Sequence, residues 1–248
     1  MALVDINGNP IGGASSILNG ADVFVFGDSN AYYSYGNSLS QVGSFYQRLS
    51  LEFTIKSWSI AGTAPGRNTW QTWSVFNQWA TAENATLYNK ENTIILFVAG
   101  TNDPLNIMTP DYNGNPNTTS ATNGIYFIAQ KCAELFPRAQ WHWILPTQMD
   151  WQKFAGDSGI DFSERDIDPK IPYLLKHLQA NAFPYCDMRY QSGVQASMLP
   201  DGVHLGGGGY NFNTAACDKY YHALRRYLMN LLGGIDMTET EARDFLKR

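Results

Sequence analysis

The residues Asp22-Val-Phe-Val-Phe-Gly-Asp-Ser-Asn30 join a short apolar run to a polar turn. An apolar run of this length, bounded by turn-forming residues, is typical of a buried β-strand. Gly27 permits a tight backbone where the strand ends, and the polar residues after it suit the start of a helix. A strand that leads directly into a helix is the repeating unit of α/β proteins, so this stretch indicates the fold class.

The same two patterns alternate along the rest of the chain. Short apolar runs predict strands, and longer amphipathic stretches between them predict helices. The predicted strands cover residues 22–26, 53–57, 93–99, 140–145 and 183–188, and the predicted helices cover residues 39–51, 69–82, 121–136, 171–181 and 210–232. Right-handed crossovers place helices on both faces of a parallel sheet. The sequence therefore predicts a flavodoxin-like, three-layer α/β/α sandwich with a five-stranded parallel sheet.

The composition fits one such domain and argues against several classes of protein. Of the 248 residues, 44% are apolar and 16% are charged, which is enough apolar material for a sizeable core. The net charge is −5 and the basic residues are scattered, so we expect no nucleic-acid partner. Cys132, Cys186 and Cys217 have neither an even count nor metal-ligand spacing, so we expect buried thiols and no disulfide or metal site.

The ends of the chain and its longest apolar runs bear on location. No apolar stretch approaches the roughly 18 to 20 residues that a membrane-spanning helix needs, so we expect no membrane association. Residues 1–20 lack a basic start followed by an apolar run, so we expect no secretory signal peptide. Their Asn-Gly, Asn-Pro and Gly-Gly pairs predict turns. We therefore divide the chain into a lead-in or attachment segment, residues 1–20, and one domain, residues 21–248.

Ser29 lies in the turn after the first predicted strand, at the edge where doubly wound sheets bind their ligands. The start of a helix favours negative charge, so a serine hydroxyl at this place suits a nucleophile. The alternative is that Asp28 or Ser29 only caps the helix, which is the commoner use of such residues. The turn alone does not decide between the two.

Two further segments add groups that a serine nucleophile needs. Asn102 follows the third predicted strand, and its NH₂ can donate to an oxyanion; the alternative is a turn in which it bonds its own backbone. Asp201-Gly-Val-His204 precedes the last helix. Its spacing lets the carboxylate accept from Nδ1 of the imidazole and leaves Nε2 to take the serine proton; the alternative is a surface loop with an exposed histidine.

Taken in order, these segments resemble the SGNH or GDSL-like hydrolases. The family's first block, Gly-Asp-Ser, matches residues 27–29; its third, Gly-x-Asn-Asp, matches residues 100–103; and its fifth, Asp-x-x-His, matches residues 201–204. Residues 59–63 are similar to the second block, with Gly62 as first candidate and Gly66 as second. The resemblance spans residues 22 to about 232.

Two positions depart from the family's pattern. Asn30 replaces the leucine of the GDSL name, and Ser57-Trp58-Ser59 replaces the asparagine often found at the start of the second block. Neither departure touches an atom expected to take part in catalysis.

The resemblance implies an SGNH hydrolase fold and a serine esterase that needs no metal or cofactor. Ser29 would attack the acyl carbon, and His204, oriented by Asp201, would act as base and then as acid. The backbone N–H groups of Ser29 and Gly62 and the side chain of Asn102 would form the oxyanion hole.

The remaining histidines compete poorly for the role of base. His142 lies inside a predicted strand and is expected in the core, while His177 and His222 lie in predicted helices far from any matched block. Asp28 and Asp103 are expected to brace their loops through hydrogen bonds to backbone groups.

The substrate that we favour is a short acyl ester, an acetyl group on a carbohydrate. Trp58, Trp70, Trp73 and Tyr112 lie in or near the segments after the second and third predicted strands, and flat rings can stack on sugar faces. The loop at residues 111–123 is polar, and no apolar lid of the kind expected in a long-chain lipase is evident. The alternative is that the aromatic residues pack helices, which Trp70 and Trp73 could do at helical spacing.

Several other functions stay open at this point, because a shared fold does not choose among them. Residues 4–11 loosely resemble segments that join enzymes to phage tail fibres or spikes. The protein would then be a virion-borne polysaccharide deacetylase, and an oligomer, in place of a cytoplasmic esterase. A general carboxylesterase or lipase, an acyltransferase, and a carbohydrate-binding domain with an idle triad would carry the same residues. The expected partner throughout is a small-molecule or glycan ester.

Overall fold

The computed structural model describes residues 21–31, 49, 54–59, 72–102, 121–156, 161, 163, 166–205 and 215–232 of the chain. Within them lies a five-stranded sheet in which all neighbouring strands are parallel. The strands are β1 (Asp22–Gly27), β2 (Thr54–Ser57), β3 (Thr93–Val98), β4 (Gln140–Leu145) and β5 (Tyr185–Asp187). Their order in space is β2-β1-β3-β4-β5. After β1 the chain adds β2 on one side of it and then adds β3, β4 and β5 on the other side. In doubly wound sheets, ligands bind beyond the carboxyl ends of the two strands where the order switches in this way, here β1 and β3.

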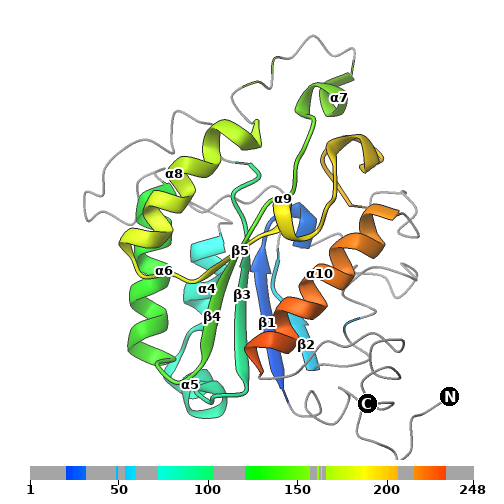
Figure 1. Ribbon diagram of the computed structural model, residues 1–248. Coiled ribbons are helices and arrows are strands. Elements are labelled where there is room, and N and C mark those ends of the chain that lie inside the picture. The colour runs from blue at the N-terminus through cyan, green and yellow to red at the C-terminus, as the bar shows by residue number, and fades with distance from the viewer. Residues whose placement is uncertain are drawn as a thin grey trace, which may run out of the picture.

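Helices cover both faces of this sheet (Figure 1). The described helices are α4 (Thr72–Trp79), α5 (Ala82–Tyr88), α6 (Ala121–Leu135), α7 (Trp151–Ala155), α8 (Ile167–Ala180), α9 (Met188–Gln191) and α10 (Ala215–Leu231), with a 3₁₀ turn at Ala196–Met198. Apolar residues of α4, α6 and α8 pack on one face, and those of α10 pack on the other. The three-layer α/β/α sandwich and the parallel sheet that the sequence predicts are confirmed.

The two faces of β1 bury different kinds of side chain. Val23 and Val25 point toward α10 and join an aliphatic core. Phe24 and Phe26 point toward α4 and α6, where they join an aromatic cluster with Phe76, Trp79, Phe97 and Trp143. Because successive side chains of a strand alternate between faces, a strand buried on both sides reads as the continuous apolar run from which it was predicted.

Several predicted boundaries are wrong. The predicted helix at residues 69–82 ends at Trp79, because the Thr81 side chain accepts a hydrogen bond from the backbone N–H of Asn84 and begins α5. The helix predicted to start at residue 171 starts at Ile167, with Pro169 in its first turn, where a missing N–H costs nothing. The short helices α7 and α9 were not predicted. Of the predicted helix 39–51, only residue 49 is described.

Candidate active site

The turn after β1 is held close to the end of β3. A Cβ on Gly27 would lie 2.3 Å from the carbonyl oxygen of Val98, so no larger residue fits between the two strands at this point. The backbone N–H of Asp28 donates to the same carbonyl at 3.0 Å. Ser29 follows as the first residue of a helical turn and is only 6% exposed. Gly27 therefore fixes where the serine hydroxyl leaves the sheet.

Asp28 braces this turn, as the sequence predicts. Its side chain is fully buried, and its two carboxylate oxygens accept from the backbone N–H of Asn30 at 3.0 Å and of Thr101 at 3.4 Å. Burial raises the pKa of Asp28 to about 6, although these hydrogen bonds favour the charged form. The carboxylate links the loop after β1 to the loop after β3.

Ser29, His204 and Asp201 lie in one hydrogen-bonded row. The Nε2 atom of His204 lies 2.9 Å from the Oγ atom of Ser29, although 175 residues separate them in the sequence. The Nδ1 atom of the same ring lies 2.6 Å from Oδ2 of Asp201. These are hydrogen-bond distances, so the imidazole is placed to accept the serine proton while Asp201 holds its other nitrogen.

The loop that carries Asp201 is fixed by its own backbone. Oδ1 of Asp201 accepts from the backbone N–H groups of Val203 at 2.9 Å and of His204 at 2.7 Å. Gly202 has a φ of +88°, and a Cβ there would lie 2.4 Å from the carbonyl oxygen of Asp150, so the loop packs tightly on the start of α7. Desolvation opposes the charge of Asp201, but its hydrogen bonds from His204 and Val203 outweigh this and hold its pKa below the usual range.

Asn102 is the fourth residue after the end of β3, and β3 pairs with β1. Its side chain is 7% exposed. The structure thus brings the loop of Asn102 beside the loop of Ser29 through the contact between Thr101 and Asp28. Gly62, Gly66, Trp70, Asp103 and Tyr112 lie outside the described residues, so their predicted roles stay predictions.

The ring of Trp58 packs against the aromatic cluster between β1 and α4. It stacks on Phe26 with ring centroids 5.6 Å apart and lies 5.7 Å from Phe24 and 5.8 Å from Trp79. Trp73 packs edge-on against Phe127. Both rings are partly buried against the core, which is the packing alternative that the sequence left open. A substrate contact of Trp58 stays a prediction.

The other histidines lie away from this row. His142 is 7% exposed in β4, its Nδ1 lies 2.8 Å from the hydroxyl of Tyr227, and burial lowers its pKa to about 4. The predicted core position of His142 is confirmed. His177 is buried in α8, and His222 is exposed on α10.

A role for the ring of Phe154 was not predicted from the sequence. This side chain is 41% exposed, and its ring stands edge-on to the imidazole of His204 with centroids 5.6 Å apart. Its helix, α7, is capped by the preceding residue, Asp150, whose side chain accepts from the backbone N–H of Lys153. An acidic residue before a short helix was the available signal, but five residues are too few to show helical periodicity.

An open polar groove adjoins α7. It has a volume of about 410 Å³ and is lined by Gln148, Met149, Asp150, Gln152, Asp166, Ile167, Asp168, Pro169 and Ala196. Burial and the neighbouring carboxylates raise the pKa of Asp166, while Lys170 acts in the opposite direction. The groove is therefore rich in hydrogen-bond acceptors and lies on the same short helix as Phe154.

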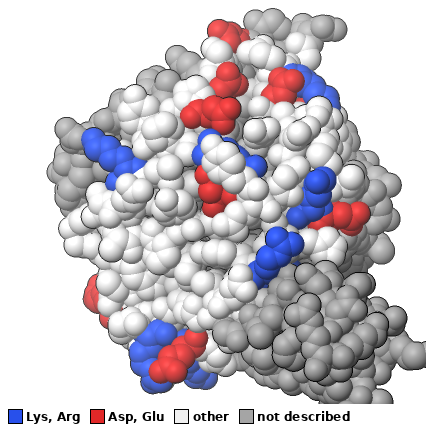
Figure 2. All heavy atoms as spheres, in the orientation of Figure 1, with Lys and Arg blue, Asp and Glu red and all other residues white. Residues whose placement is uncertain are grey.

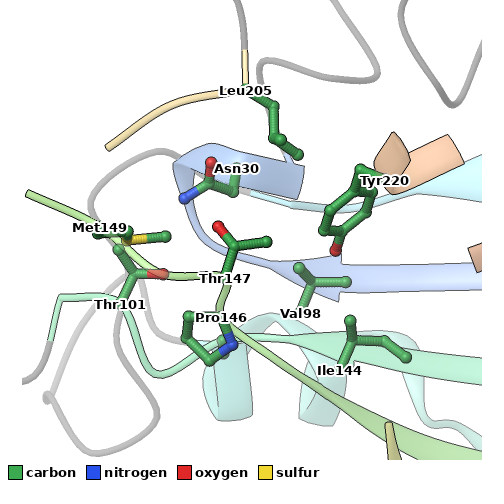
Figure 3. A pocket seen from close by; sticks show the side chains of 10 residues that line it. Asn30, Val98, Thr101, Ile144, Pro146, Thr147, Met149, Leu205 and Tyr220 are labelled. Carbon is green, nitrogen blue, oxygen red and sulfur yellow. The ribbon is translucent and has the colours of Figure 1, made fainter. Parts of the chain in front are cut away.

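A small cavity lies on the inner side of the nucleophile turn (Figure 3). Its volume is about 10 Å³, close to the space that one water molecule needs. Figure 3 shows the amide of Asn30 and the hydroxyl of Thr147 turned toward the same space, with Tyr220 and Met149 at its sides. Both polar atoms of the Asn30 side chain are buried, and neither has a hydrogen-bond partner in the part of the chain that the structure describes.

Charged side chains of both signs are interspersed on the face of the molecule drawn in Figure 2. Among the described residues, no helix has the length and apolar character needed to cross a membrane.

No protein-family model matches the chain, and no curated protein matches it. Solved structures do. A protein described as a GDSL-like lipase from Parabacteroides merdae is 15% identical, with a TM-score of 0.51 over 86% of this chain and 95% of that one. A protein described as an arylesterase from Agrobacterium tumefaciens is also 15% identical, with a TM-score of 0.51 over 85% of this chain and 99% of that one. A protein from Lactobacillus plantarum is 14% identical, with a TM-score of 0.59 over 85% of this chain and 97% of that one. At such identities the likeness concerns the fold, and the SGNH hydrolase-like fold that the motifs indicated is confirmed.

Proposed function

We propose that the protein is a serine esterase in which Ser29 is the nucleophile and His204 is the base. One observation carries this proposal: a single imidazole lies within hydrogen-bond distance of a serine hydroxyl on one side and of a carboxylate on the other. A helix cap, the alternative for Ser29, needs neither neighbour. The parallel sheet supports the proposal because Ser29 follows the carboxyl end of β1, at the edge where doubly wound sheets bind their ligands.

The reaction proceeds by two acyl transfers. Ser29 Oγ attacks the acyl carbon as its proton passes to Nε2 of His204, and a tetrahedral oxyanion forms. The oxyanion collapses, the bond to the alcohol breaks, and the alcohol leaves with the proton from His204. Water then attacks the acyl carbon as its proton passes to Nε2 of His204. The second tetrahedral oxyanion collapses, the bond to Ser29 Oγ breaks, and Ser29 takes the proton back from His204 as the acid leaves. The low pKa of Asp201 keeps it anionic, so it stabilises the imidazolium formed in each half of the cycle.

Oxyanion stabilisation falls to three groups in this proposal: the N–H of Ser29, the N–H of Gly62 and the side chain of Asn102. Removing one such donor typically lowers kcat by about 10² to 10³. The burial of Asn102 next to the nucleophile's loop supports its part, because a hydrogen bond in a dry site is stronger than the same bond in water.

The test is the substitution Ser29→Ala, assayed with p-nitrophenyl acetate. We expect hydrolysis to fall to background while the circular dichroism spectrum and the thermal midpoint stay close to those of the wild type. Ser74→Ala, on the partly buried surface of α4, is the matched control and keeps full activity. Retained hydrolysis in Ser29→Ala overturns the proposal.

We further propose that the acyl group is short and that the alcohol is a carbohydrate. The exposed ring of Phe154 beside His204 supports this, because aromatic rings pack on the apolar faces of sugars. The adjoining groove supports it as well, since carboxylate and amide oxygens accept hydrogen bonds from sugar hydroxyls. Acetate release from acetylated polysaccharides, with a rate on p-nitrophenyl esters that falls as the acyl chain lengthens, is expected. A rate that rises with chain length contradicts the acetyl assignment.

A general carboxylesterase is the second candidate, favoured by the names of similarly folded proteins, a lipase and an arylesterase. Comparable rates on aryl, alkyl and sugar esters would identify it. Transfer of the acyl group to another alcohol uses the same side chains, and analysis of the products with added acceptor alcohols separates transfer from hydrolysis.

A further inference from the structure

Lys170 is a fully buried lysine near the start of α8. It is among the largest side chains that the fold buries completely, and its neighbours Ile171 and Leu174 belong to the apolar core. A lysine amine is seldom withdrawn from water in this way unless it is paired, because burial removes its hydration. Its position at the positive end of a helix adds to the cost. A buried amine of this kind must be satisfied by polar contacts inside the protein.

One such contact is with the loop of the predicted oxyanion donor. The Nζ atom of Lys170 donates to the backbone carbonyl of Thr101 at 2.8 Å, in a buried hydrogen bond that spans 69 residues of sequence. The carbonyl of Thr101 belongs to the peptide unit whose N–H is that of Asn102. The orientation of this planar unit sets the direction in which the Asn102 side chain leaves the backbone.

Thr101 is held from the opposite side by the nucleophile's turn. Its N–H donates to Asp28 at 3.4 Å, and Asp28 directly precedes Ser29. The loop after β3 thus lies between a carboxylate tied to the nucleophile and an amine supplied by α8. A shift of the peptide at Thr101 would change the distance between the Asn102 amide and the acyl oxygen on Ser29.

We propose that Lys170 is a positioning residue that acts through Asn102: its amine holds the Thr101 carbonyl so that the Asn102 side chain meets the oxyanion formed at Ser29. The inference rests on the proposed esterase function. Oxyanion donors act only when they lie about 2.7 to 3.1 Å from the developing charge, and a misplacement of about 1 Å can cost about 100-fold in rate. A flexible core side chain in place of Lys170 leaves the carbonyl of Thr101 without its donor and frees the loop to move.

The experiment is a double-mutant cycle between Lys170→Met and Asn102→Ala, with kcat and KM measured on p-nitrophenyl acetate. In the wild-type background, Lys170→Met is expected to lower kcat by about 10- to 100-fold and to leave KM within about threefold. In the Asn102→Ala background, the same substitution is expected to lower kcat less than twofold, because the donor that Lys170 positions is already gone. Lys176→Met, an exposed lysine on the same helix, is the matched control and leaves kcat unchanged.

A structural lysine gives a different result. If Lys170 only stabilises α8, for example through Asp166 one turn earlier, Lys170→Met lowers the thermal midpoint and its effect on kcat is the same with or without Asn102. Equal effects in the two backgrounds, or a wild-type kcat in Lys170→Met, overturn the inference. If Lys170→Met does not fold, the cycle is repeated with Lys170→Arg, which keeps a donor of different shape. The inference then requires that Lys170→Arg lowers kcat in the wild-type background and lowers it less than twofold in the Asn102→Ala background.

Failure of the esterase proposal is distinguishable from failure of this inference. A wild-type protein that neither hydrolyses the ester nor reacts with a fluorophosphonate contradicts the esterase proposal, and the cycle then has no rate to compare. If the wild type hydrolyses the ester and reacts with the fluorophosphonate, but the effects of Lys170→Met and Asn102→Ala on kcat are additive, then only the role of Lys170 is contradicted.

Discussion

Asp201→Asn is the substitution whose effect the geometry determines most closely. Asp201 accepts three hydrogen bonds: Oδ1 takes the backbone N–H groups of Val203 and His204, and Oδ2 takes Nδ1 of the imidazole. An asparagine has one acceptor oxygen. Two backbone donors at 2.9 and 2.7 Å compete for it against one ring nitrogen, so we expect the amide oxygen to stay on the backbone and the NH₂ to face His204.

The consequence is a histidine with its proton on the wrong nitrogen. An NH₂ group facing Nδ1 requires that atom to accept, which places the proton on Nε2, 2.9 Å from the Ser29 hydroxyl. His204 then cannot take the serine proton. The same change in a serine-protease triad lowers kcat by about 10⁴, which corresponds to about 5 kcal/mol of transition-state stabilisation. We expect a loss of that order here, while the loop keeps its two backbone hydrogen bonds.

The assay is steady-state hydrolysis of p-nitrophenyl acetate at neutral pH, with thermal unfolding measured in parallel. Asp22→Asn is the matched control, because Asp22 begins β1 at the end of the sheet remote from the triad. A folded Asp201→Asn protein whose kcat stays within tenfold of the wild type would refute the assigned role of Asp201.

Three further predictions follow from other contacts. Burial raises the pKa of Asp28 from 3.8 to about 6, so the folded protein binds this proton more tightly than the unfolded chain does. The stabilisation is present below a pH of about 4 and is lost as the pH rises through about 6, so between these two pH values the wild type should lose about 2 kcal/mol of unfolding free energy that Asp28→Asn does not lose. Equal changes in the unfolding free energies of the wild type and of Asp28→Asn between these pH values would contradict this prediction. Asn30→Leu removes a buried amide whose atoms have no partner among the described residues, so we expect about 1 to 3 kcal/mol more stability in urea; lower stability would count against it. Phe154→Ala should raise KM for aryl and sugar esters several-fold and leave kcat within about twofold, whereas a lower kcat at unchanged KM would mean that the ring orients His204 instead.

The central strands β1 and β3 were predictable because they are buried on both faces. Phe24 and Val25 point to opposite sides, yet both are fully enclosed, so the sequence shows an unbroken apolar run. Helix ends were less predictable, since they depend on individual hydrogen bonds. The cap by Thr81 divides one amphipathic stretch into two helices, and nothing in its periodicity indicates the break.

Those residues of the candidate site that belong to short sequence motifs were predictable. Asp201 and His204 lie three residues apart, and the order of the motifs along alternating strands and helices places them near Ser29. Contacts made by residues outside any motif were not predictable. Lys170 meets Thr101 across 69 residues, and Phe154 meets His204 because a glycine lets the loop pack on α7.

The central claim is that Ser29 is a nucleophile activated by His204, and covalent labelling tests it most directly. The protein is treated with a fluorophosphonate, digested, and analysed by mass spectrometry. We predict one adduct, on the peptide that contains Ser29, and a loss of labelling in the folded His204→Ala protein because the hydroxyl then has no base at 2.9 Å. An unlabelled wild type, or an adduct on another residue with Ser29 unmodified, would contradict the claim.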